Sequence, residues 1–315
     1  MIDRYGRYID YLRISVTDLC NLRCVYCMPE EGVKKLDHDD ILSVEDIEEI
    51  AVSAASLGIR KIRLTGGEPL IRKGILDIIS RISRLPGVDE VALTTNGTLL
   101  EKFAPKLKKA GLTRVNISID AFDPDTYREI TRGGEIADVL AGIQAAIDAG
   151  LTPIKLNAVL MGGVNDNHIR PLVSMTEEAD FRVRFIEIMP IGECAGWNKE
   201  RFLSVSKVLE EEPELEPIGT DGVSKLYRKP GSKGSIGLIS PISNHFCPTC
   251  NKLRVTSDGK LKPCLHSAEE IDLQGLHGEA LTDAIRDAIL AKPLKHELAR
   301  GQYSGSIRGM SAIGG

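Results

Sequence analysis

Short β-rich runs alternate with helical patterns between residues 12 and 190, and this alternation constrains the fold more than any other feature. Six runs are predicted to be strands: Leu12–Thr17, Lys61–Thr65, Glu90–Asn96, Arg114–Asp120, Pro153–Met161 and Arg182–Met189. Helical patterns lie between them, at Val44–Leu57, Ile75–Leu85, Glu101–Ala110, Ala137–Ala149 and His168–Ala179. Strands that alternate with helices at this spacing form βαβ units, which predicts one parallel sheet.

The side chains along these strands favour an open barrel. One set of alternate positions is apolar, as in Ile62 and Leu64, whereas the other carries cations, hydroxyls and amides, as in Arg13, Arg63 and Asn116. A parallel strand buried on both faces is apolar on both, and a closed eight-stranded barrel has bulky aliphatic residues inside. We therefore predict an α/β fold with a partial, six-stranded parallel β/α barrel and a polar interior. A sheet with one solvated face is the alternative.

The regular alternation ends near Pro190. The segments 192–197 and 210–216 have the composition of loops. Ile236–Ile242 is a predicted strand, Leu253–Leu261 a predicted hairpin around Ser257–Gly259, and Glu279–Leu290 a predicted helix. Because 315 residues exceed what one small core needs, we expect residues 1–221 to form the barrel and residues 222–315 a smaller C-terminal domain.

Three cysteines, Cys20, Cys24 and Cys27, follow the first predicted strand at C-x3-C-x2-C spacing. Thiolates this close cannot all pair as disulfides, and an odd number leaves one over. Soft thiolates suit zinc or iron–sulfur centres. A cubane cluster usually takes four cysteines, so three would leave one iron open to a non-protein ligand. We predict a metal site, with a purely structural cysteine cluster as the alternative.

A second group has the spacing Cys247-x2-Cys250-x13-Cys264. On spacing alone, an iron–sulfur centre and a zinc site with His245 or His266 as fourth ligand are equally compatible. The remaining cysteine, Cys194, matches no motif and is predicted to be a small buried apolar residue.

Composition restricts the classes of function. The net charge of −5 and the pI near 5.8 argue against a general nucleic-acid binder. No apolar stretch is long enough to span a bilayer, and the first residues do not read as a signal peptide. Seven cysteines in such a chain indicate metal chemistry rather than disulfides, so we expect a cytoplasmic protein.

The chain has no G-x4-G-K-[ST] motif, so the phosphates of any nucleotide must meet side-chain cations. Arg13, Arg63, Lys155, Lys61 and Arg184 fall on the polar parity of different strands and could supply them. Several such cations on one parity favour a shared anionic ligand over scattered surface salt bridges.

The turn Thr65-Gly66-Gly67-Glu68-Pro69 follows the second predicted strand. Paired glycines let a backbone approach a ligand closely, and Glu68 just beyond them could take an ammonium group. Taken alone, this motif is better explained as an ordinary βα turn.

Together these motifs resemble those of radical S-adenosylmethionine (SAM) enzymes, in which C-x3-C-x2-C carries an aromatic residue, here Tyr26, before its third cysteine. The segments LRISVTDLCNLRCVYCMP and FCPTCNKLRVTSDGKLKPCLH are similar to those of the MoaA-type cyclase family of molybdenum-cofactor biosynthesis. The terminal Gly314-Gly315 matches the tail that this family extends toward its active site. The resemblance covers nearly the whole chain, from Ile9 to Gly315.

The resemblance implies two [4Fe–4S] clusters, one on Cys20, Cys24 and Cys27 and one on Cys247, Cys250 and Cys264. It places SAM at Tyr26, Gly67, Ser118 and Met189. It places GTP at Arg13, Arg63, Thr94, Lys155, Lys252, Leu253 and Arg254. Lys252 stands where the family usually has Arg, and Lys lacks the planar fork that grips a phosphate with two parallel hydrogen bonds.

The function implied is that of a lyase that cyclises GTP to (8S)-3′,8-cyclo-7,8-dihydroguanosine 5′-triphosphate by radical chemistry on SAM, without an assigned acid or base residue. The implied partners are GTP, a one-electron donor and a downstream cyclic pyranopterin monophosphate synthase, for a monomer or homodimer without nucleic-acid or membrane partners. Two alternatives remain: another radical SAM enzyme with an auxiliary cluster, such as a peptide maturase, and a non-catalytic zinc-stabilised binding module.

Overall fold

The computed structural model describes residues 1–315 except 35, 198, 297, 299–303, 307 and 315. Within this described part, the strands form one sheet in the order β12-β11-β10-β1-β2-β3-β4-β5-β6-β9-β8-β7. The strands are β1 Tyr11–Ser15, β2 Lys61–Thr65, β3 Glu90–Thr95, β4 Arg114–Ser118, β5 Lys155–Leu160, β6 Arg182–Glu187, β7 Glu216–Asp221, β8 Ser224–Arg228, β9 Ser235–Ile239, β10 Lys252–Val255, β11 Lys260–Lys262 and β12 Ile271–Asp272. The helices are α1 Val44–Ser56, α2 Ile75–Ile82, α3 Leu100–Lys109, α4 Pro124–Thr131, α5 Ile136–Asp148, α6 Ile169–Glu178, α7 Ser206–Glu211 and α8 Gly278–Ala291.

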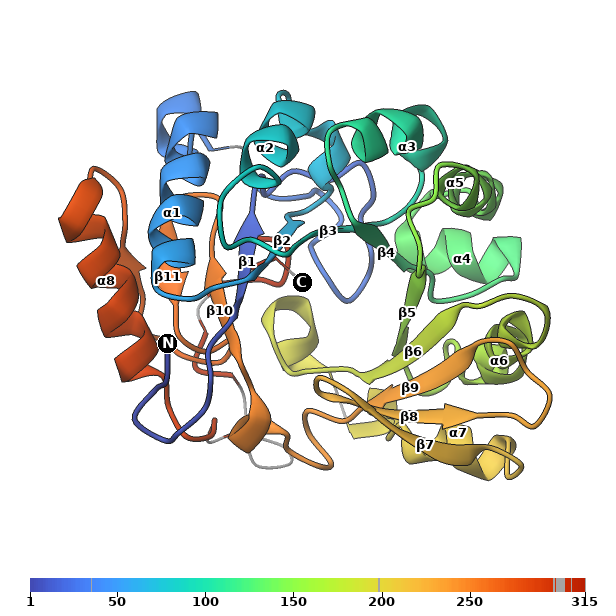
Figure 1. Cartoon of the computed structure of the whole chain (residues 1–315). Helices are drawn as coiled ribbons and strands as arrows, with labels where there is room; N and C mark the ends of the chain where they lie inside the picture. The colour runs from blue at the N-terminus through green and yellow to red at the C-terminus, as the bar shows by residue number, and fades with distance from the viewer. Residues whose placement is uncertain (35, 198, 297, 299–303, 307, 315) are drawn as a thin grey trace.

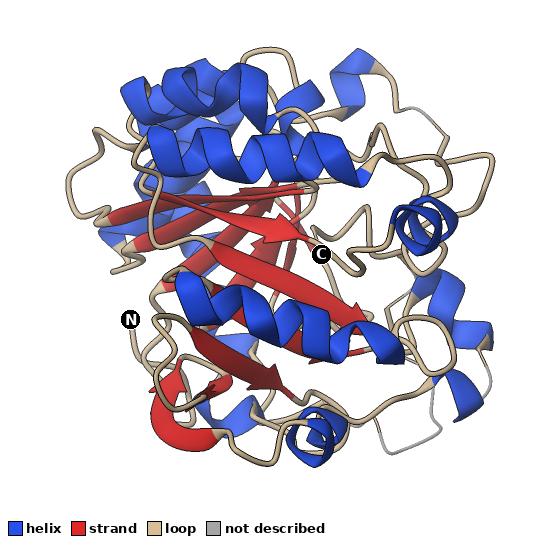
Figure 2. Cartoon of the chain, turned by 90° about the vertical axis from the view of Figure 1, so that its right-hand side faces the viewer, coloured by secondary structure: helices blue, strands red, loops and turns tan. Residues whose placement is uncertain are grey.

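The predicted partial barrel is confirmed. Strands β1 to β6 follow one another in chain order and are all parallel. They curve into an open arc with α1 to α5 on its outer side, and the two edge strands, β12 and β7, lie at opposite ends of the sheet order (Figure 1). Figure 2 shows the helices stacked against the outer face of the strands. The inner face of the strands lines a cavity.

The alternation along the strands sorts side chains between core and hollow, as predicted. Ile62, Leu64, Val115, Ile117 and Leu156 are fully buried in the core between the sheet and the helices. Helix α1 illustrates the local signals: Ser43 and Asp46 form a capping box at its start. Gly58 follows its end in the left-handed conformation, with φ of +93°, as the sequence indicates.

The C-terminal elements extend the same sheet at both edges. Strand β9 pairs in parallel with β6, and β10 pairs in parallel with β1. The predicted hairpin around Ser257–Gly259 is present, since β10 and β11 are antiparallel. Helix α8 packs beside α1. The predicted domain boundary after Asp221 falls in the turn of the antiparallel β7–β8 hairpin, and the division into two domains stays a prediction.

The prediction of a loop at 210–216 is wrong at both of its ends, because α7 runs to Glu211 and β7 begins at Glu216. Strand β7 is almost wholly exposed, so it lacks the apolar alternation by which strands are recognised. Helix α4 was also missed. It is a short helix, and its Asp123 cap and first-turn Pro124 are both typical of a helix start.

Candidate active site

A cavity of about 670 Å³ lies inside the arc of strands, and both cysteine trios line it. Each cysteine of the chain, all of them within the described residues, is free of disulfides. The cavity is also lined by every predicted SAM and GTP residue except Leu253. The Leu253 side chain is buried in the core, so any contact from this residue to a ligand has to come from its main chain.

The first trio lies on the loop after β1, and the Gly66-Gly67 turn after β2 holds that loop. The amide of Gly67 donates to the carbonyl of Thr17 (2.8 Å), and the amide of Glu68 donates to the carbonyl of Leu19 (2.8 Å). A Cβ at Gly67 would collide with the Leu19 carbonyl oxygen. The glycines are therefore needed for close packing against the cysteine loop, and Gly67 also faces the cavity.

The expectation that Glu68 takes an ammonium group is wrong. Its side chain is fully buried and is not among the residues that line the cavity. Its carboxylate accepts hydrogen bonds from the Leu70 amide (2.9 Å), the Thr95 hydroxyl (2.8 Å) and the Asn96 amide (2.8 Å). Burial raises its pKa to about 7 in spite of these donors. Glu68 is a structural brace between the ends of β2 and β3, which sequence spacing alone could not reveal.

The thiols of the first trio fit a shared metal centre. Burial, followed by the charges of Cys27, Asp120 and Cys20, raises the pKa of Cys24 well above its usual range. Burial and the charge of Cys20 raise the pKa of Cys27 to about 12. Three neighbouring thiolates repel one another unless a cation lies between them, and a metal cluster supplies that cation.

Tyr26 lines the cavity beside this trio, and its hydroxyl contacts Asp120, a site residue that the sequence motifs did not single out. Its hydroxyl donates to Asp120 Oδ2 (2.7 Å), while Asp120 Oδ1 accepts from the Val159 amide (2.8 Å). Burial raises the pKa of Asp120 to about 6. Asp120 follows β4 on the polar parity, which is the signal that could have singled it out.

Cys194 is buried as predicted, and its thiol lies 3.1 Å from the carbonyl of Tyr26. It belongs to the 3-10 helix Gly192–Gly196, which lies next to the first trio's loop. It is thus a packing contact for the segment that carries Tyr26, and it also faces the cavity.

The second trio is surrounded by cations. Lys292, 3% exposed, donates from Nζ to the carbonyls of Lys252 (2.7 Å) and Pro263 (2.8 Å). Burial alone would raise the pKa of Cys250, but the charges of Lys292 and Lys252 hold it below its usual range. Arg7, from the N-terminal segment, donates to the carbonyl of Cys247 (2.9 Å). The protein therefore stabilises thiolate at Cys250, which is the form that ligates a metal.

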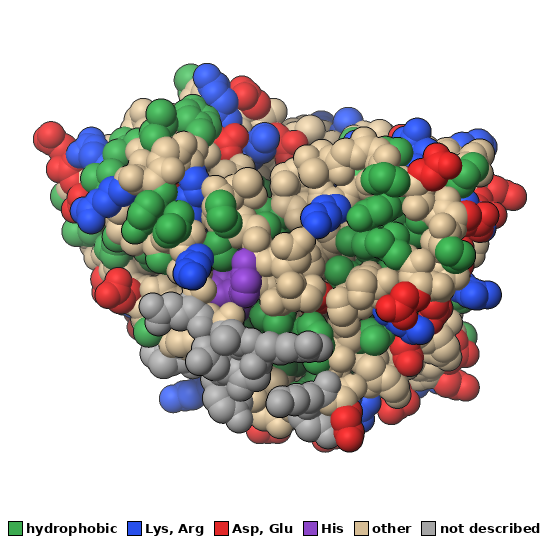
Figure 3. Space-filling view, turned by 90° about the horizontal axis from the view of Figure 1, so that it is seen from below, with side chains coloured by type: hydrophobic (Ala, Val, Ile, Leu, Met, Phe, Trp, Pro, Cys, Tyr) green, Lys and Arg blue, Asp and Glu red, His purple; other side chains and the backbone are tan. Residues whose placement is uncertain are grey.

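Histidines lie beside the second trio. His245 Nδ1 is 3.1 Å from His296 Nε2, and one ligand atom from each of His245, Cys247 and His296 falls within 4.8 Å of the others. His266, by contrast, contacts Ser304 (3.1 Å). Histidine side chains reach the surface in Figure 3, where cationic and acidic side chains are otherwise intermingled. The zinc alternative thus keeps a geometric basis at His245 but not at His266.

Three arginines share one level of the sheet. Strand register places Arg254 of β10 next to Arg13 of β1, and Arg13 next to Arg63 of β2. Burial, then the charges of Arg254 and Arg63, lowers the pKa of Arg13. Burial also lowers the pKa of Arg254, to about 10. Among the described residues, Arg63 and Arg254 form no salt bridge to a carboxylate. Such a level of buried like charges favours an anionic ligand.

A second level of polar side chains runs through Thr94, Asn116 and Lys155 on β3, β4 and β5. The hydroxyl of Thr94 and the amide nitrogen of Asn116 are buried and have no hydrogen-bond partner among the described residues. Buried polar atoms are rarely left unpaired, so this wall of the cavity is suited to a polar ligand.

Asp221 is a further residue that the sequence did not indicate. Its Oδ2 accepts from Lys155 (2.6 Å), Arg182 (2.8 Å) and Arg184 (2.6 Å). Burial acts to raise the pKa of Asp221, but the bond from Lys155 and the charge of Arg184 hold it well below its usual range. The cations on β5 and β6 are therefore partly neutralised by the protein itself.

The C-terminal tail enters the cavity, and the end of the chain lies within the arc of strands in Figure 1. The guanidinium of Arg254 donates to the carbonyls of Gly314 (2.6 Å) and Ile313 (3.3 Å). A Cβ at Gly314 would collide with the hydroxyl of Thr65. Gly315, the second glycine of the predicted tail, lies outside the described residues.

None of the helices in the described ranges combines the length and the apolar character that crossing a bilayer requires.

Two family models match the chain, the Radical SAM superfamily over residues 14–175 and Molybdenum Cofactor Synthesis C over residues 181–298. Among solved structures, the chain is similar to SuiB of Streptococcus suis, with a TM-score of 0.65, 16% identity and coverage of 92% of this chain and 68% of that one. It is also similar to anSMEcpe with bound AdoMet, with a TM-score of 0.57, 16% identity and coverage of 92% and 83%. At this identity the likeness shows the fold alone.

The fold, the C-x3-C-x2-C loop and the matching model together define a radical SAM enzyme. The chain is 53% identical over 320 residues to a GTP 3′,8-cyclase of Alkaliphilus metalliredigens, with the full length of both chains covered. The chain therefore belongs to the GTP 3′,8-cyclase family.

Proposed function

We propose that this enzyme is a lyase that cyclises GTP to (8S)-3′,8-cyclo-7,8-dihydroguanosine 5′-triphosphate, an early step of molybdenum-cofactor biosynthesis. One observation carries the proposal: two cysteine trios and a level of buried arginines line the same cavity. A substrate that bears both a polyphosphate and a purine can meet cations with one end and a metal centre with the other. The sequence has no P-loop motif to hold the phosphates, so side-chain cations would bind them.

The proposal assigns a [4Fe–4S] cluster to each trio. Cys20, Cys24 and Cys27 would hold the first, and Cys247, Cys250 and Cys264 the second. When bound, the first cluster and SAM supply a carbon-centred radical that can remove hydrogen from the ribose. Tyr26, Gly67, Ser118 and Met189 would line the SAM position, and all four face the cavity.

The protein's own contribution is to place the substrate and to shield it. Arg13, Arg63 and Arg254 would bind the polyphosphate, while Thr94 and Lys155 also line the cavity. Fixed placement of reacting groups can supply about 7–11 kcal/mol of a barrier in well-oriented reactions. Exclusion of water and other groups prevents side reactions of a radical, and the tail that fills part of the cavity contributes to it.

Further assignments belong to the same proposal. Residues 1–221 would form the barrel and residues 222–315 the domain that brings in the second cluster. The enzyme would accept electrons singly from a donor protein, pass its product to a cyclic pyranopterin monophosphate synthase, and work in the cytoplasm as a monomer or homodimer.

The test is anaerobic reconstitution followed by incubation with dithionite, SAM and GTP. The proposal predicts that GTP is consumed in step with release of 5′-deoxyadenosine. Release of 5′-deoxyadenosine with GTP untouched would instead favour a radical SAM enzyme of another class, such as a peptide maturase. A colourless protein that holds zinc and cleaves no SAM would favour the zinc-stabilised binding module, for which the proximity of His245, Cys247 and His296 is the supporting observation.

A further inference from the structure

The last described residues follow a path from the outer edge of the sheet into the cavity. Gly309 packs against Gly192, where a Cβ would lie 2.9 Å from the Gly309 Cα. Met310 lines the cavity. Ser311 and Ile313 are buried, and Gly314 reaches the bottom of the arc at Thr65 and Arg254. The tail is thus an integral part of the cavity wall.

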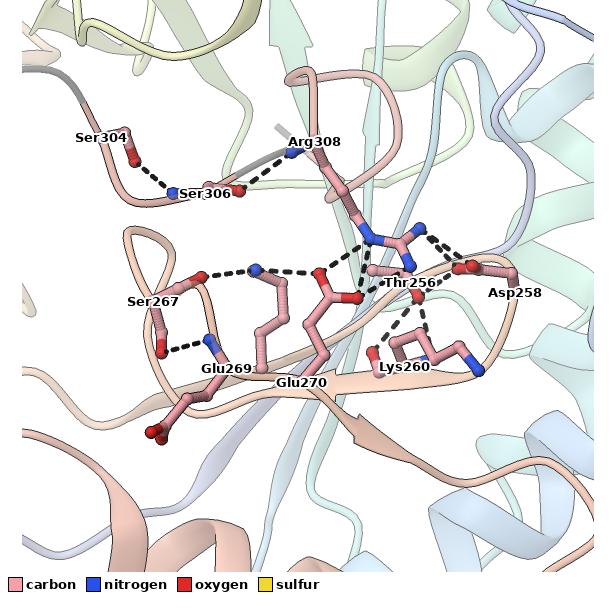
Figure 4. Close-up of polar contacts among 10 residues, drawn as sticks. Thr256, Asp258, Lys260, Ser267, Glu269, Glu270, Ser304, Ser306 and Arg308 are labelled. Carbon is pink, nitrogen blue, oxygen red and sulfur yellow. Dashed lines mark hydrogen bonds and ion pairs between the residues drawn. The ribbon is translucent and has the colours of Figure 1, made fainter.

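Arg308 is the residue at which this path begins, and two carboxylates hold its guanidinium (Figure 4). Its Nε lies 2.8 Å from Glu270 Oε1 and its Nη2 lies 2.8 Å from Glu270 Oε2. Its Nη1 lies 2.9 Å from Asp258 Oδ1. All three nitrogens of the Arg308 guanidinium therefore contact a carboxylate. The Arg308 side chain is only 21% exposed.

Glu270 is itself fixed from the protein side. Lys262, fully buried, donates to Glu270 Oε1 (3.0 Å) and to the carbonyl of Ser267 (2.7 Å). Asp258 lies in the turn between β10 and β11, where it accepts from the Thr256 hydroxyl (2.5 Å). An isolated surface ion pair contributes little, but a bidentate Arg–carboxylate contact inside a network of fixed partners is worth more.

The partners of Arg308 belong to the elements that carry the substrate side of the cavity. Strand β10 bears Arg254 and Lys252, and Cys264 follows β11. The ion-pair network therefore ties the start of the tail to the same hairpin whose Arg254 contacts the end of the tail. The tail is held at both ends by one hairpin, with Met310 and Ser311 between them.

We propose that Arg308 is a positioning residue for the cyclisation: its contacts with Glu270 and Asp258 keep the tail in the cavity, so that the radical and its substrate are shielded and Arg254 stays in place. This inference rests on the proposed function for its catalytic consequence. When the Arg308 contacts are removed, the tail leaves the cavity more often and water enters. SAM is then cleaved without a matching conversion of GTP.

The first experiment follows the tail directly. Carboxypeptidase is applied to the full chain, and release of C-terminal amino acids is timed by mass spectrometry. Loss of these charge-assisted hydrogen bonds should speed release from Arg308→Ala by about ten-fold or more, since cleavage follows local opening. Arg308→Lys, which keeps the charge but not the fork, should lie between Arg308→Ala and the wild type.

Arg128→Ala is the matched control. Arg128 also grips a carboxylate with its fork, since its Nη2 lies 2.9 Å from Glu135 Oε2, but both side chains are at the surface and Arg128 has no hydrogen bond or ion pair to the tail among the described residues. Carboxypeptidase should release C-terminal amino acids from Arg128→Ala at the wild-type rate. Equal release from Arg308→Ala and the wild type would overturn the proposal.

The second experiment measures coupling in the reconstituted enzyme as 5′-deoxyadenosine formed per GTP consumed. The ratio should rise several-fold in Arg308→Ala, rise less in Arg308→Lys and stay unchanged in Arg128→Ala. A lowered melting temperature with an unchanged ratio would mean that Arg308 has a structural role only, and would overturn the proposal. If no variant and no wild type consumes GTP, the proposed function fails, while the carboxypeptidase comparison still decides whether Arg308 holds the tail.

Discussion

The two cysteine trios face the same cavity but differ in the cations that lie beside them. At the first trio, burial and then neighbouring negative groups such as Asp120 raise the pKa values of Cys24 and Cys27. At the second trio, burial also raises the pKa of Cys247, but the charges of Lys292 and Lys252 outweigh burial at Cys250 and lower its pKa. A metal centre must supply most of the compensating charge at Cys24 and Cys27, whereas the protein supplies part of it at Cys250.

This difference fits a division of labour across the cavity. The side with Tyr26 and Asp120 has little positive charge of its own, which suits a cationic sulfonium cofactor. The side with Lys252 and Arg254 is cationic, which suits a polyphosphate. The electrostatics thus favour the proposed placement of cofactor and substrate on opposite sides of the cavity.

The largest expected effect comes from removing one trio at a time. Cys24→Ala should abolish formation of 5′-deoxyadenosine, because the first cluster loses a ligand and SAM has no reductant. Cys250→Ala should keep formation of 5′-deoxyadenosine but abolish conversion of GTP. Chromatography of both products in a single anaerobic reaction makes the measurement. Loss of 5′-deoxyadenosine in both variants to the same extent would show that the two sites are not functionally distinct.

A smaller effect is expected from Lys292→Met, which removes a buried charge beside the second trio only. In cluster-free protein, the pKa of Cys250 should rise, and each unit of rise lowers the thiolate fraction at neutral pH about ten-fold. Alkylation of Cys250 by iodoacetamide, followed by mass spectrometry, should slow by that order. Lys229→Met, which removes an ion-paired Lys from the surface near α6, is the control. Equal slowing at Cys24 and Cys250 would contradict a local charge effect.

Much of this contrast could be predicted from the sequence, because strand parity has a strict period of two. Arg13 and Arg63 fall on the polar parity of neighbouring predicted strands, and the structure brings them to the same level. Arg254 joins them because β10 pairs with β1, which no local pattern reveals. The second trio lines the same cavity as the first because of this long-range pairing of β10 with β1.

The residues that the sequence missed are those whose partners come from distant segments. Asp221 lies at the end of an exposed strand, at the expected domain boundary, so nothing local marks it as the acceptor for Lys155 and Arg184. Glu68 was misjudged for the same reason, since its donors belong to the end of β3. Motif spacing singles out the cysteines because the members of each trio lie close together in the sequence.

Lys252 offers a finer test of the substrate side. Lys252→Arg restores the planar fork, and one added bidentate phosphate contact should lower the KM for GTP several-fold, at about 1.4 kcal/mol for each factor of ten. Lys61→Arg, two strands away at the same level of the sheet, should change KM less, because Lys61 is half-exposed and lies 3.8 Å from Asp10. A rise in KM on Lys252→Arg would mean that the pocket is shaped for the ammonium group.

The smallest effect concerns Lys155, whose pKa is lowered to about 7 by burial and by Arg184 and Arg114, against the pull of Asp221. The unfolded chain binds a proton at Lys155 up to about pH 10.5, whereas the folded protein releases it near pH 7. Stability should therefore rise between pH 7 and 10.5 in the wild type relative to Lys155→Met. Urea denaturation at pH 6.5, 8 and 9.5 makes the comparison, and a difference that is flat with pH would show that Lys155 titrates normally.

The most direct measurement of the central claim is metal content, determined by mass spectrometry on anaerobically reconstituted wild type, Cys24→Ala and Cys250→Ala. Two [4Fe–4S] clusters, each held by three cysteines at the same cavity, predict about eight iron atoms per wild-type chain and about four in each variant. About four irons in the wild type, together with zinc that is lost in His245→Ala, would contradict the account and assign the second trio to zinc.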